Sequence, residues 1–114
     1  MSECLFCRIA AGTLPSTKVA ESEQALAIRD LHPQAPTHVL LIPKHHVAGS
    51  AAELDASHGA ILGELFALAA RVAVQERLKH GWRLVTNVGP DAGQTVPHLH
   101  VHLLGGRQMT WPPG

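Results

Sequence analysis

The sequence predicts a single α+β domain built on an antiparallel sheet. Its 114 residues suit one domain, residues 1–114, rather than two. Several short strand patterns surround one long helical pattern, and the connections between them are short. Too few helices alternate with the strands for a doubly wound parallel sheet, so the antiparallel arrangement is favoured.

The first half of the chain is expected to form a short helix and three strands. Cys4–Ala11 can form a helix that stops at Gly12, because glycine adopts the left-handed conformation at low cost. Lys18–Ala20 and Gln24–Arg29 are short candidate strands separated by polar residues. Thr37–Ile42 is rich in β-branched and large apolar residues, which favour a strand.

The long helix is the strongest element of the pattern. Ser50 and Glu53 fit a capping box, and Asp55 is a second candidate N-cap. The apolar residues that follow at helical spacing are Ile61, Leu65, Leu68 and Val72. We expect the helix to run to about Lys79 and to be closed by Gly81.

The last third of the chain predicts two further strands. Trp82–Val88 has a strand pattern, and the Gly- and Pro-containing residues 89–93 form a loop. His98–Leu104 is the final strand, ended by two glycines. The Pro-rich tail Met109–Gly114 is too short to fold alone.

Charge and composition argue against some classes of function. Nine Lys and Arg balance nine Asp and Glu, so no net charge draws the protein to nucleic acid or to an anionic membrane. The first residues lack the features of a signal peptide, and no apolar stretch approaches the roughly 20 residues that cross a bilayer. We therefore expect a cytoplasmic protein without a nucleic-acid or membrane partner.

The final strand carries three alternate histidines, His98, His100 and His102. Side chains alternate between the faces of a strand, so the three imidazoles share one face and the intervening apolar residues can be buried. A merely exposed face would be expected to carry Lys, Glu or Thr. A metal site of the three rings is a second alternative, although ligands on one straight strand diverge rather than surround a tetrahedral ion.

A catalytic interpretation requires a nucleophile, a group that orients it, and donors for an anion. A neutral imidazole held in one tautomer is a good nucleophile at phosphorus, and flanking rings can supply a proton to the leaving group. The preceding loop offers amide, backbone and hydroxyl donors. These donors come from Asn87, Gly93, Gln94 and Thr95.

These residues resemble the signature of the histidine triad (HIT) family, His-x-His-x-His followed by two apolar residues. Residues 30–38, with the apolar strand and Ile42-Pro43-Lys44 that follow, resemble the family's N-terminal half. Residues 93–96 resemble its phosphate loop. The ending, residues 105–109 and 111–114, is similar to the Hint branch, the nucleoside phosphoramidases.

The resemblance implies a fold and a set of site residues. The family fold is a five-stranded antiparallel sheet with one long and one short helix, and two protomers form a homodimer with a continuous sheet. His100 resembles the nucleophile, and His102 resembles the ring that contacts phosphate and leaving group. His98 and His38 resemble the pair that orients the nucleophile. The implied nucleotide contacts are Asp30 for the ribose, Asn87, Gly93, Gln94 and Thr95 for the phosphate, and Phe6, Ile9, Ile28, Leu31 and Leu40 for a purine.

Two positions depart from the family pattern. Ile28 stands where the branch often has an aromatic ring, so stacking on the base is expected to be weaker. Thr110 lies where some members carry His, which weakens the case for a leaving-group role there.

The cysteines Cys4 and Cys7 allow three interpretations: ordinary helix residues, a redox pair, or metal ligands. The resemblance adds His46 and His98, because several bacterial relatives bind zinc with such a pair and two histidines. A Cys2His2 set would suit a tetrahedral, structural zinc ion. No cofactor is expected to be required for catalysis.

The sequence therefore favours a hydrolase that cleaves the P–N bond of purine nucleoside 5′-phosphoramidates through a nucleotidyl-histidine. One alternative is a dinucleoside polyphosphate hydrolase that uses the same nucleophile. The other is a nucleotide-binding regulatory or scaffold protein. The remaining histidines are expected to be surface or structural residues, namely His32, His45, His58 and His80.

Overall fold

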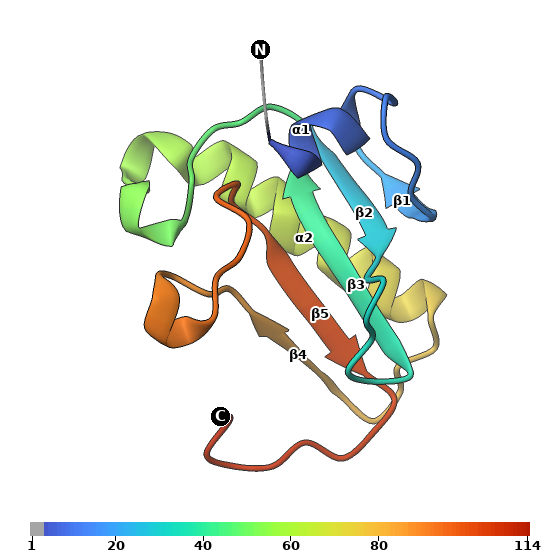
Figure 1. Ribbon diagram of the computed structural model, residues 1–114. Coiled ribbons are helices and arrows are strands. Elements are labelled where there is room, and N and C mark those ends of the chain that lie inside the picture. The colour runs from blue at the N-terminus through green and yellow to red at the C-terminus, as the bar shows by residue number, and fades with distance from the viewer. Residues whose placement is uncertain (1–3) are drawn as a thin grey trace.

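Five antiparallel strands form one sheet in the order β1-β2-β3-β5-β4 (Figure 1). The structure is a computed structural model that describes residues 4–114. Its elements are α1 (Leu5–Ala10), β1 (Lys18–Glu21), β2 (Ala25–Arg29), β3 (Thr37–Pro43), α2 (Gly59–Gln75), β4 (Trp82–Val85) and β5 (Val101–Gly105). The expected sheet, with one long and one short helix, is confirmed.

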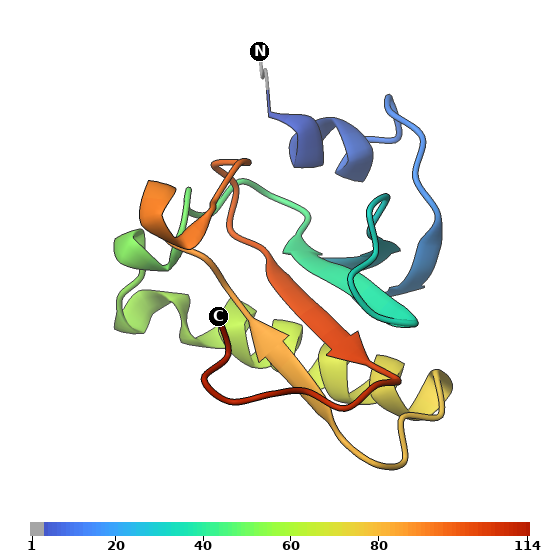
Figure 2. The ribbon, with the colours of Figure 1, turned by 60° about the horizontal axis from the view of Figure 1, so that its bottom comes forward.

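The central strand β3 is buried along its whole length. Val39 and Leu41 pack in the cluster that includes the buried stripe of α2, whereas Leu40 and Ile42 pack on the opposite side with Phe6 of α1. A strand covered on both faces needs apolar residues at successive positions, which explains the continuous apolar run. Figure 2 shows α2 behind the sheet and the C-terminal tail in front of it.

The long helix covers the rear face with Leu65, Leu68 and Val72. The segment Ala56–Gln75 is long and apolar enough to cross a membrane by length and composition. Our expectation that no stretch approaches that length is therefore wrong. The reason is structural: α2 is a core helix whose buried stripe rests on the sheet, and such helices share the composition of a membrane span.

The ends of α2 differ from the expected ends. Asp55 caps a short 3-10 turn, Ala56–His58, by accepting the Ser57 N–H, and the α-helix begins only at Gly59. At the other end Arg77 has a φ of 60°. The N–H groups of Arg77 and Leu78 return to the carbonyls of Val74 and Ala73, which is a Schellman closure. The helix therefore ends at Gln75, six residues before Gly81, the residue expected to close it.

The two C-terminal strands are shorter than predicted, because β4 ends at Val85 and β5 begins at Val101. The backbone groups of the residues just before β5 form hydrogen bonds outside the regular strand pairing. The Leu99 N–H bonds to the Ala48 carbonyl, and the Thr86 hydroxyl donates to the His100 carbonyl at 2.8 Å. His98 and His100 thus lie on a bent segment that leads into the strand.

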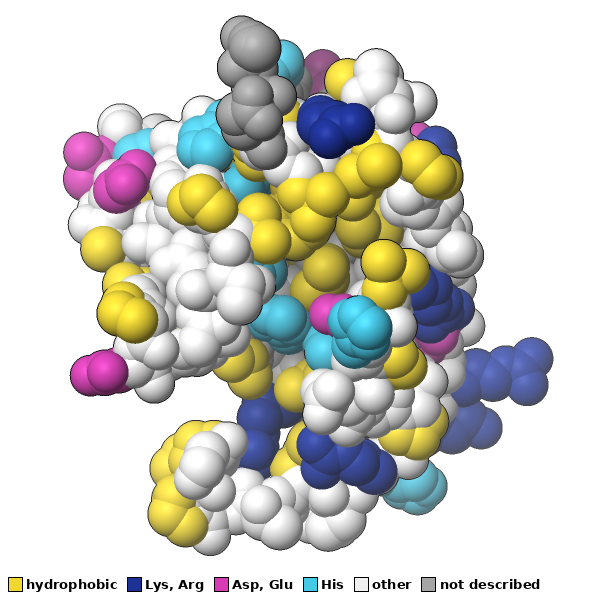
Figure 3. All heavy atoms as spheres, viewed as in Figure 1, with side chains coloured by type: hydrophobic (Ala, Val, Ile, Leu, Met, Phe, Trp, Pro, Cys, Tyr) yellow, Lys and Arg dark blue, Asp and Glu magenta, His cyan; other side chains and the backbone are white. Residues whose placement is uncertain are grey.

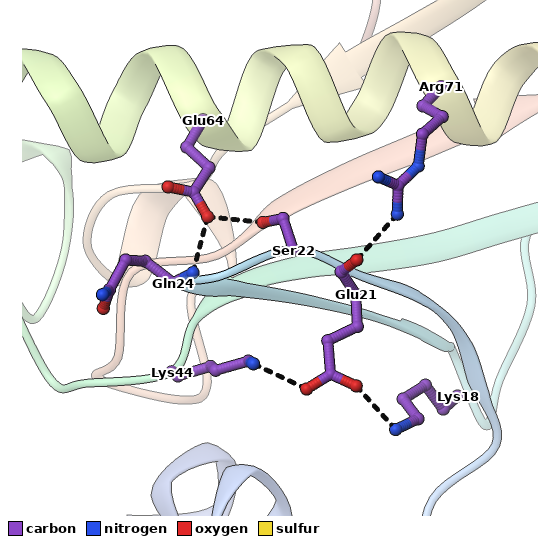
Figure 4. Close-up of polar contacts among 7 residues, drawn as sticks. All are labelled: Lys18, Glu21, Ser22, Gln24, Lys44, Glu64 and Arg71. Carbon is purple, nitrogen blue, oxygen red and sulfur yellow. Dashed lines mark hydrogen bonds and ion pairs between the residues drawn. The ribbon is translucent and has the colours of Figure 1, made fainter.

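Polar contacts fasten the β1–β2 hairpin to its surroundings (Figure 4). Glu64 of α2 accepts the Gln24 N–H at 2.6 Å, and Arg71 donates to the Glu21 carbonyl at 2.7 Å. The Glu21 carboxylate accepts hydrogen bonds from Lys18 and Lys44, which lower its pKa to about 2. These contacts hold β1 and β2 in place, and this hairpin carries one wall of the candidate active site.

Candidate active site

Three histidines gather on the face of the sheet opposite α2. His38 lies on β3, His102 lies on β5, and His100 immediately precedes β5. The ring centroids of His100 and His102 are 5.1 Å apart, as are those of His38 and His102. His38 and His100 are buried. The face predicted for the alternate histidines is confirmed: Phe6 packs edge-on against both His98 and His100, and His100 lies beside His102.

The hydrogen bonds of His100 assign its tautomer. Its Nδ1 lies 2.7 Å from the His98 carbonyl oxygen. A carbonyl can only accept, so Nδ1 must carry the proton, and Nε2 of the neutral ring keeps its lone pair. The edge-on Phe6 ring, 5.0 Å away between centroids, holds the imidazole in place. This is the arrangement that a histidine nucleophile requires.

A second chain of hydrogen bonds assigns His38 and His102. The Gln34 N–H donates to His38 Nδ1 at 3.0 Å, so a neutral His38 carries its proton on Nε2. That nitrogen lies 2.9 Å from His102 Nδ1. His102 Nδ1 is therefore the acceptor, and Nε2 of the neutral His102 carries a proton. The site thus places a lone pair on His100 beside an N–H donor on His102.

Burial favours the neutral forms of His38 and His102. Desolvation is the main cause that lowers the pKa of His102 to about 4; the neighbouring His100 and His38 act in the same direction, and Asp30 opposes the shift. The pKa of His38 is also lowered, mainly by burial and against the attraction of Asp30. Asp30 Oδ2 lies 3.4 Å from His38 Nε2. Neutral rings are what the tautomer assignments above require.

An apolar slot lies beside the histidines, between α1 and the sheet. Its buried residues are Phe6, Leu26, Ile28, Leu40 and Ile42, with Ile9, Cys4 and Val96 against them. Figure 3 shows a recess lined with hydrophobic side chains, and histidines at its lower edge. The structure brings together four of the five residues expected around a purine. Leu31 lies apart from them, with 85% of its surface exposed.

Leu26 and Ile42 belong to this slot although sequence reasoning omitted them. Each lies two residues from a predicted slot residue on the same strand, Leu26 from Ile28 and Ile42 from Leu40. Because strand side chains alternate between faces, that spacing would have identified both.

Asp30 follows β2 and remains partly exposed beside the slot. Its Oδ1 accepts the His32 N–H at 2.7 Å, which leaves Oδ2 near His38. The carboxylate therefore lies within reach of both the histidine chain and a ligand placed over the slot. Its expected contact with ribose hydroxyls remains a prediction.

The loop before the histidines contains the 3-10 turn Pro90–Ala92, closed by Gly93 with a φ of 80°. Gln94 braces this loop: its amide donates to the Gly49 and Val96 carbonyls and accepts the Gly89 N–H. Thr95 is exposed and Asn87 is partly exposed. Thr95 and Asn87 are thus available to an anion, whereas the Gln94 side chain is engaged within the protein.

The second cluster of potential ligands is Cys4, Cys7, His46 and His98, whose ligand atoms lie within 4.8 Å of one another. The His98 Nδ1 is 3.0 Å from Cys4 Sγ and 3.5 Å from Cys7 Sγ. His46 Nδ1 is 3.6 Å from Cys7 Sγ. Tetrahedral zinc with its usual bond lengths places sulfur and nitrogen ligands about 3.5 Å apart.

The environment of His98 agrees with a metal ligand. Its Nε2 lies 3.0 Å from the Pro43 carbonyl, so Nε2 carries the proton and Nδ1 presents a lone pair to the cluster. Metal-bound histidines are usually oriented in this way by a second hydrogen bond. The four residues fit a zinc ion that would join α1 to the segment before β5.

Comparisons with known proteins agree with this geometry. The HIT domain family matches residues 11–109. The chain is 51% identical to the maize "14 kDa zinc-binding protein", with 99% of this chain and 89% of that protein covered. It is 47% identical to "Adenylylsulfatase HINT1" of Arabidopsis thaliana, with 99% and 78% covered.

Solved structures show the same fold at high similarity. The HIT family hydrolase of Legionella pneumophila has a TM-score of 0.94 at 50% identity, covering 98% of this chain and all of that one. A histidine triad protein of Clostridium difficile has a TM-score of 0.90 at 37% identity, with 96% of each chain covered. The chain therefore belongs to the histidine triad family of nucleotide hydrolases, in its Hint-like branch.

Proposed function

We propose that this protein hydrolyses purine nucleoside 5′-phosphoramidates through a covalent nucleotidyl-His100 intermediate. The observation that supports this proposal is the assigned pair of tautomers, a lone pair on His100 Nε2 beside an N–H on His102. A nucleophile and a donor on adjacent rings are the two groups that displacement at phosphorus needs.

In the first step His100 Nε2 attacks phosphorus and the P–N bond breaks. The amine leaves with the electron pair of that bond and takes up a solvent proton relayed through the His102 N–H, so that the His102 ring stays neutral. In the second step water attacks the phosphorus of the nucleotidyl-histidine, releasing the nucleoside monophosphate and restoring His100. The backbone carbonyl of His98 accepts a hydrogen bond from the Nδ1–H of His100 throughout.

Ligand binding would use the surfaces around these rings. The base would enter the slot lined by Phe6, Ile28 and Leu40, and apolar burial would contribute to its affinity. Asp30 would accept the ribose hydroxyls. Asn87, Thr95 and the backbone around Gly93 would contact the phosphate oxygens.

The decisive experiment is hydrolysis of adenosine 5′-phosphoramidate combined with trapping of the nucleotidylated protein and mapping of the modified side chain. We expect the adenylyl group on His100, and a loss of turnover of at least about 10³-fold in His100→Ala. His45→Ala, which removes an exposed histidine, is the matched control and should retain activity. Modification of another residue, or an active His100→Ala protein, would refute the covalent role.

A second candidate reaction is hydrolysis of adenylyl sulfate, in which sulfate replaces the amine. Two observations favour it: the name of the Arabidopsis relative, and the low pKa of His102. A ring with that pKa is rarely protonated at pH 7, and sulfate can leave without a proton. The ratio of kcat/KM for the phosphoramidate and for adenylyl sulfate distinguishes the two candidates.

We also propose that Cys4, Cys7, His46 and His98 bind a structural zinc ion. The donor set and its spacing support the proposal, as does the name of the maize relative. Metal analysis of protein purified without chelators should find one zinc per chain. Absence of stoichiometric zinc from such protein would exclude the site.

A homodimer joined through β4 is the proposed assembly. β4 is an edge strand of the sheet, and Trp82 is exposed there, as are Phe66 and Val74 on α2. Exposed apolar side chains beside an unpaired strand edge are typical of an interface. Sedimentation equilibrium should give twice the 12.2 kDa chain mass.

A further inference from the structure

Arg83 lies on the same face of the sheet as the catalytic histidines. On β4, Val85 is opposite His102 and Arg83 is opposite Leu104. Residues two apart on a strand point to the same side. Arg83 is therefore a cation that the sheet register places on the same face as His102, one strand away and two residues along.

The contacts of Arg83 leave its charge without a counter-ion. The guanidinium donates to the Thr110 carbonyl at 3.2 Å and lies 5.9 Å from the centre of the Trp111 ring. Backbone carbonyls and indole rings hold a guanidinium in place without neutralising it. Among residues 4–114, no Asp or Glu forms an ion pair with Arg83.

A groove of about 610 Å³ continues from Arg83 along this end of the molecule. Its cationic or imidazole lining residues are Arg77, Lys79, His80, Arg83 and Arg107, and no carboxylate belongs to the lining. In Figure 3, Lys and Arg side chains lie between the histidines and the lower end of the molecule. The chain has no net charge, so the fold separates its charges and concentrates positive ones here.

We propose that this groove is an anion subsite, with Arg83 as its specificity-determining residue, that receives a negatively charged leaving group. This inference rests on the proposed function and narrows its substrate class. When His100 attacks phosphorus, the bond to the leaving group breaks and its electron pair departs with that group. An anionic leaving group gains stabilisation from Arg83, whereas an uncharged one does not.

The test compares three adenosine 5′-phosphoryl substrates with matched leaving groups. Propylamine is uncharged once bonded to phosphorus, β-alanine has a similar length with a terminal carboxylate, and sulfate is a compact anion. In Arg83→Gln we expect kcat/KM to fall about tenfold for the two anionic leaving groups, the loss of roughly one charge-assisted hydrogen bond. The propylamine substrate should change less than twofold.

Two variants control for indirect effects. Arg71→Gln removes a guanidinium from α2, on the opposite face of the sheet, and should leave the ratios between the three rates unchanged. Trp111→Ala releases the tail from Arg83 while keeping the guanidinium, and should retain the preference for anionic leaving groups. Equal losses on all three substrates in Arg83→Gln would show that Arg83 only anchors the tail, which would overturn the proposal.

A binding measurement separates this proposal from the proposed reaction. Titration of the wild-type protein with inorganic sulfate, followed by ¹⁵N NMR, should shift signals of Arg83 and its groove neighbours, and Arg83→Gln should lose those shifts. If the wild type cleaves none of the substrates, the proposed function is refuted, but the sulfate titration still tests the anion subsite independently. Sulfate shifts that persist in Arg83→Gln, or no shifts in the wild type, would overturn it.

Discussion

The low pKa of His102 makes the fold sensitive to mild acid in a way that one substitution should remove. The folded ring has a pKa of about 4, against an ordinary value of 6.5. As the pH falls from 7 towards 4, the unfolded chain takes up a proton that the folded protein refuses. Stability that is present above pH 6.5 is therefore lost progressively through this window.

The size of the effect follows from the two pKa values. Between pH 7 and pH 5 the ideal loss from this one ring is roughly 2 kcal/mol. His102 is partly exposed, and solvent screening reduces the penalty, so we expect about 1 kcal/mol. In His102→Gln the amide oxygen can still accept the hydrogen bond from His38, but the titrating group is gone.

Urea unfolding at pH 7 and pH 5, at one protein concentration, measures the effect. The wild type should lose about 1 kcal/mol more than His102→Gln between the two pH values. This double difference cancels the contributions of His38 and His98, whose pKa values are also lowered by burial. Equal losses in both proteins would show that His102 takes up a proton as readily when folded as when unfolded, which would invalidate its assignment as a neutral donor.

Three further predictions concern the ligand, the metal and the backbone. Asp30→Ala should raise KM for adenosine 5′-phosphoramidate more than it lowers kcat, because the contact with the ribose already forms when the substrate binds. A fall in kcat with an unchanged KM would contradict this prediction. Cys7→Ser should purify without stoichiometric zinc and with a lower Tm, and added zinc should raise the Tm of the wild type only. Gly106→Ala should destabilise the protein by about 2 kcal/mol or more, because φ is +91° and the new Cβ would lie 2.9 Å from Pro36 Cβ. Urea unfolding checks the last, and an unchanged midpoint would argue against that backbone conformation.

The fold was predictable because its main signals are local. The apolar run over residues 37–42 and the helical spacing around Leu65 and Leu68 each report burial in the correct element. Element ends were less predictable. Arg77, rather than a glycine, adopts the left-handed conformation that closes α2, and no local pattern distinguishes it from the residues around it.

The site was only partly predictable because some of its contacts join distant segments. Alternation correctly placed His100 and His102 on one face. The resemblance supplied Asp30 and most of the slot, but Leu31 is exposed and does not belong to the slot cluster. The hydroxyl of Thr86, which holds the His100 carbonyl, and the Gln34 N–H, which assigns the His38 tautomer, depend on contacts that sequence spacing does not reveal.

His98 shows what alternation leaves open, which is the partner of a side chain rather than the face it occupies. Period-two reasoning correctly assigns its ring to the face that carries His100, because Phe6 packs edge-on against both rings. On that face the His98 ring reaches Cys4 and Cys7, while its carbonyl accepts the Nδ1–H of His100. One residue thus contacts the two cysteines with its side chain and orients His100, the proposed nucleophile, with its backbone. Cys4 and Cys7 lie at the start of α1, the segment that carries Phe6. A zinc ion bound there would therefore fix the position of His100 relative to Phe6, which forms one wall of the base slot.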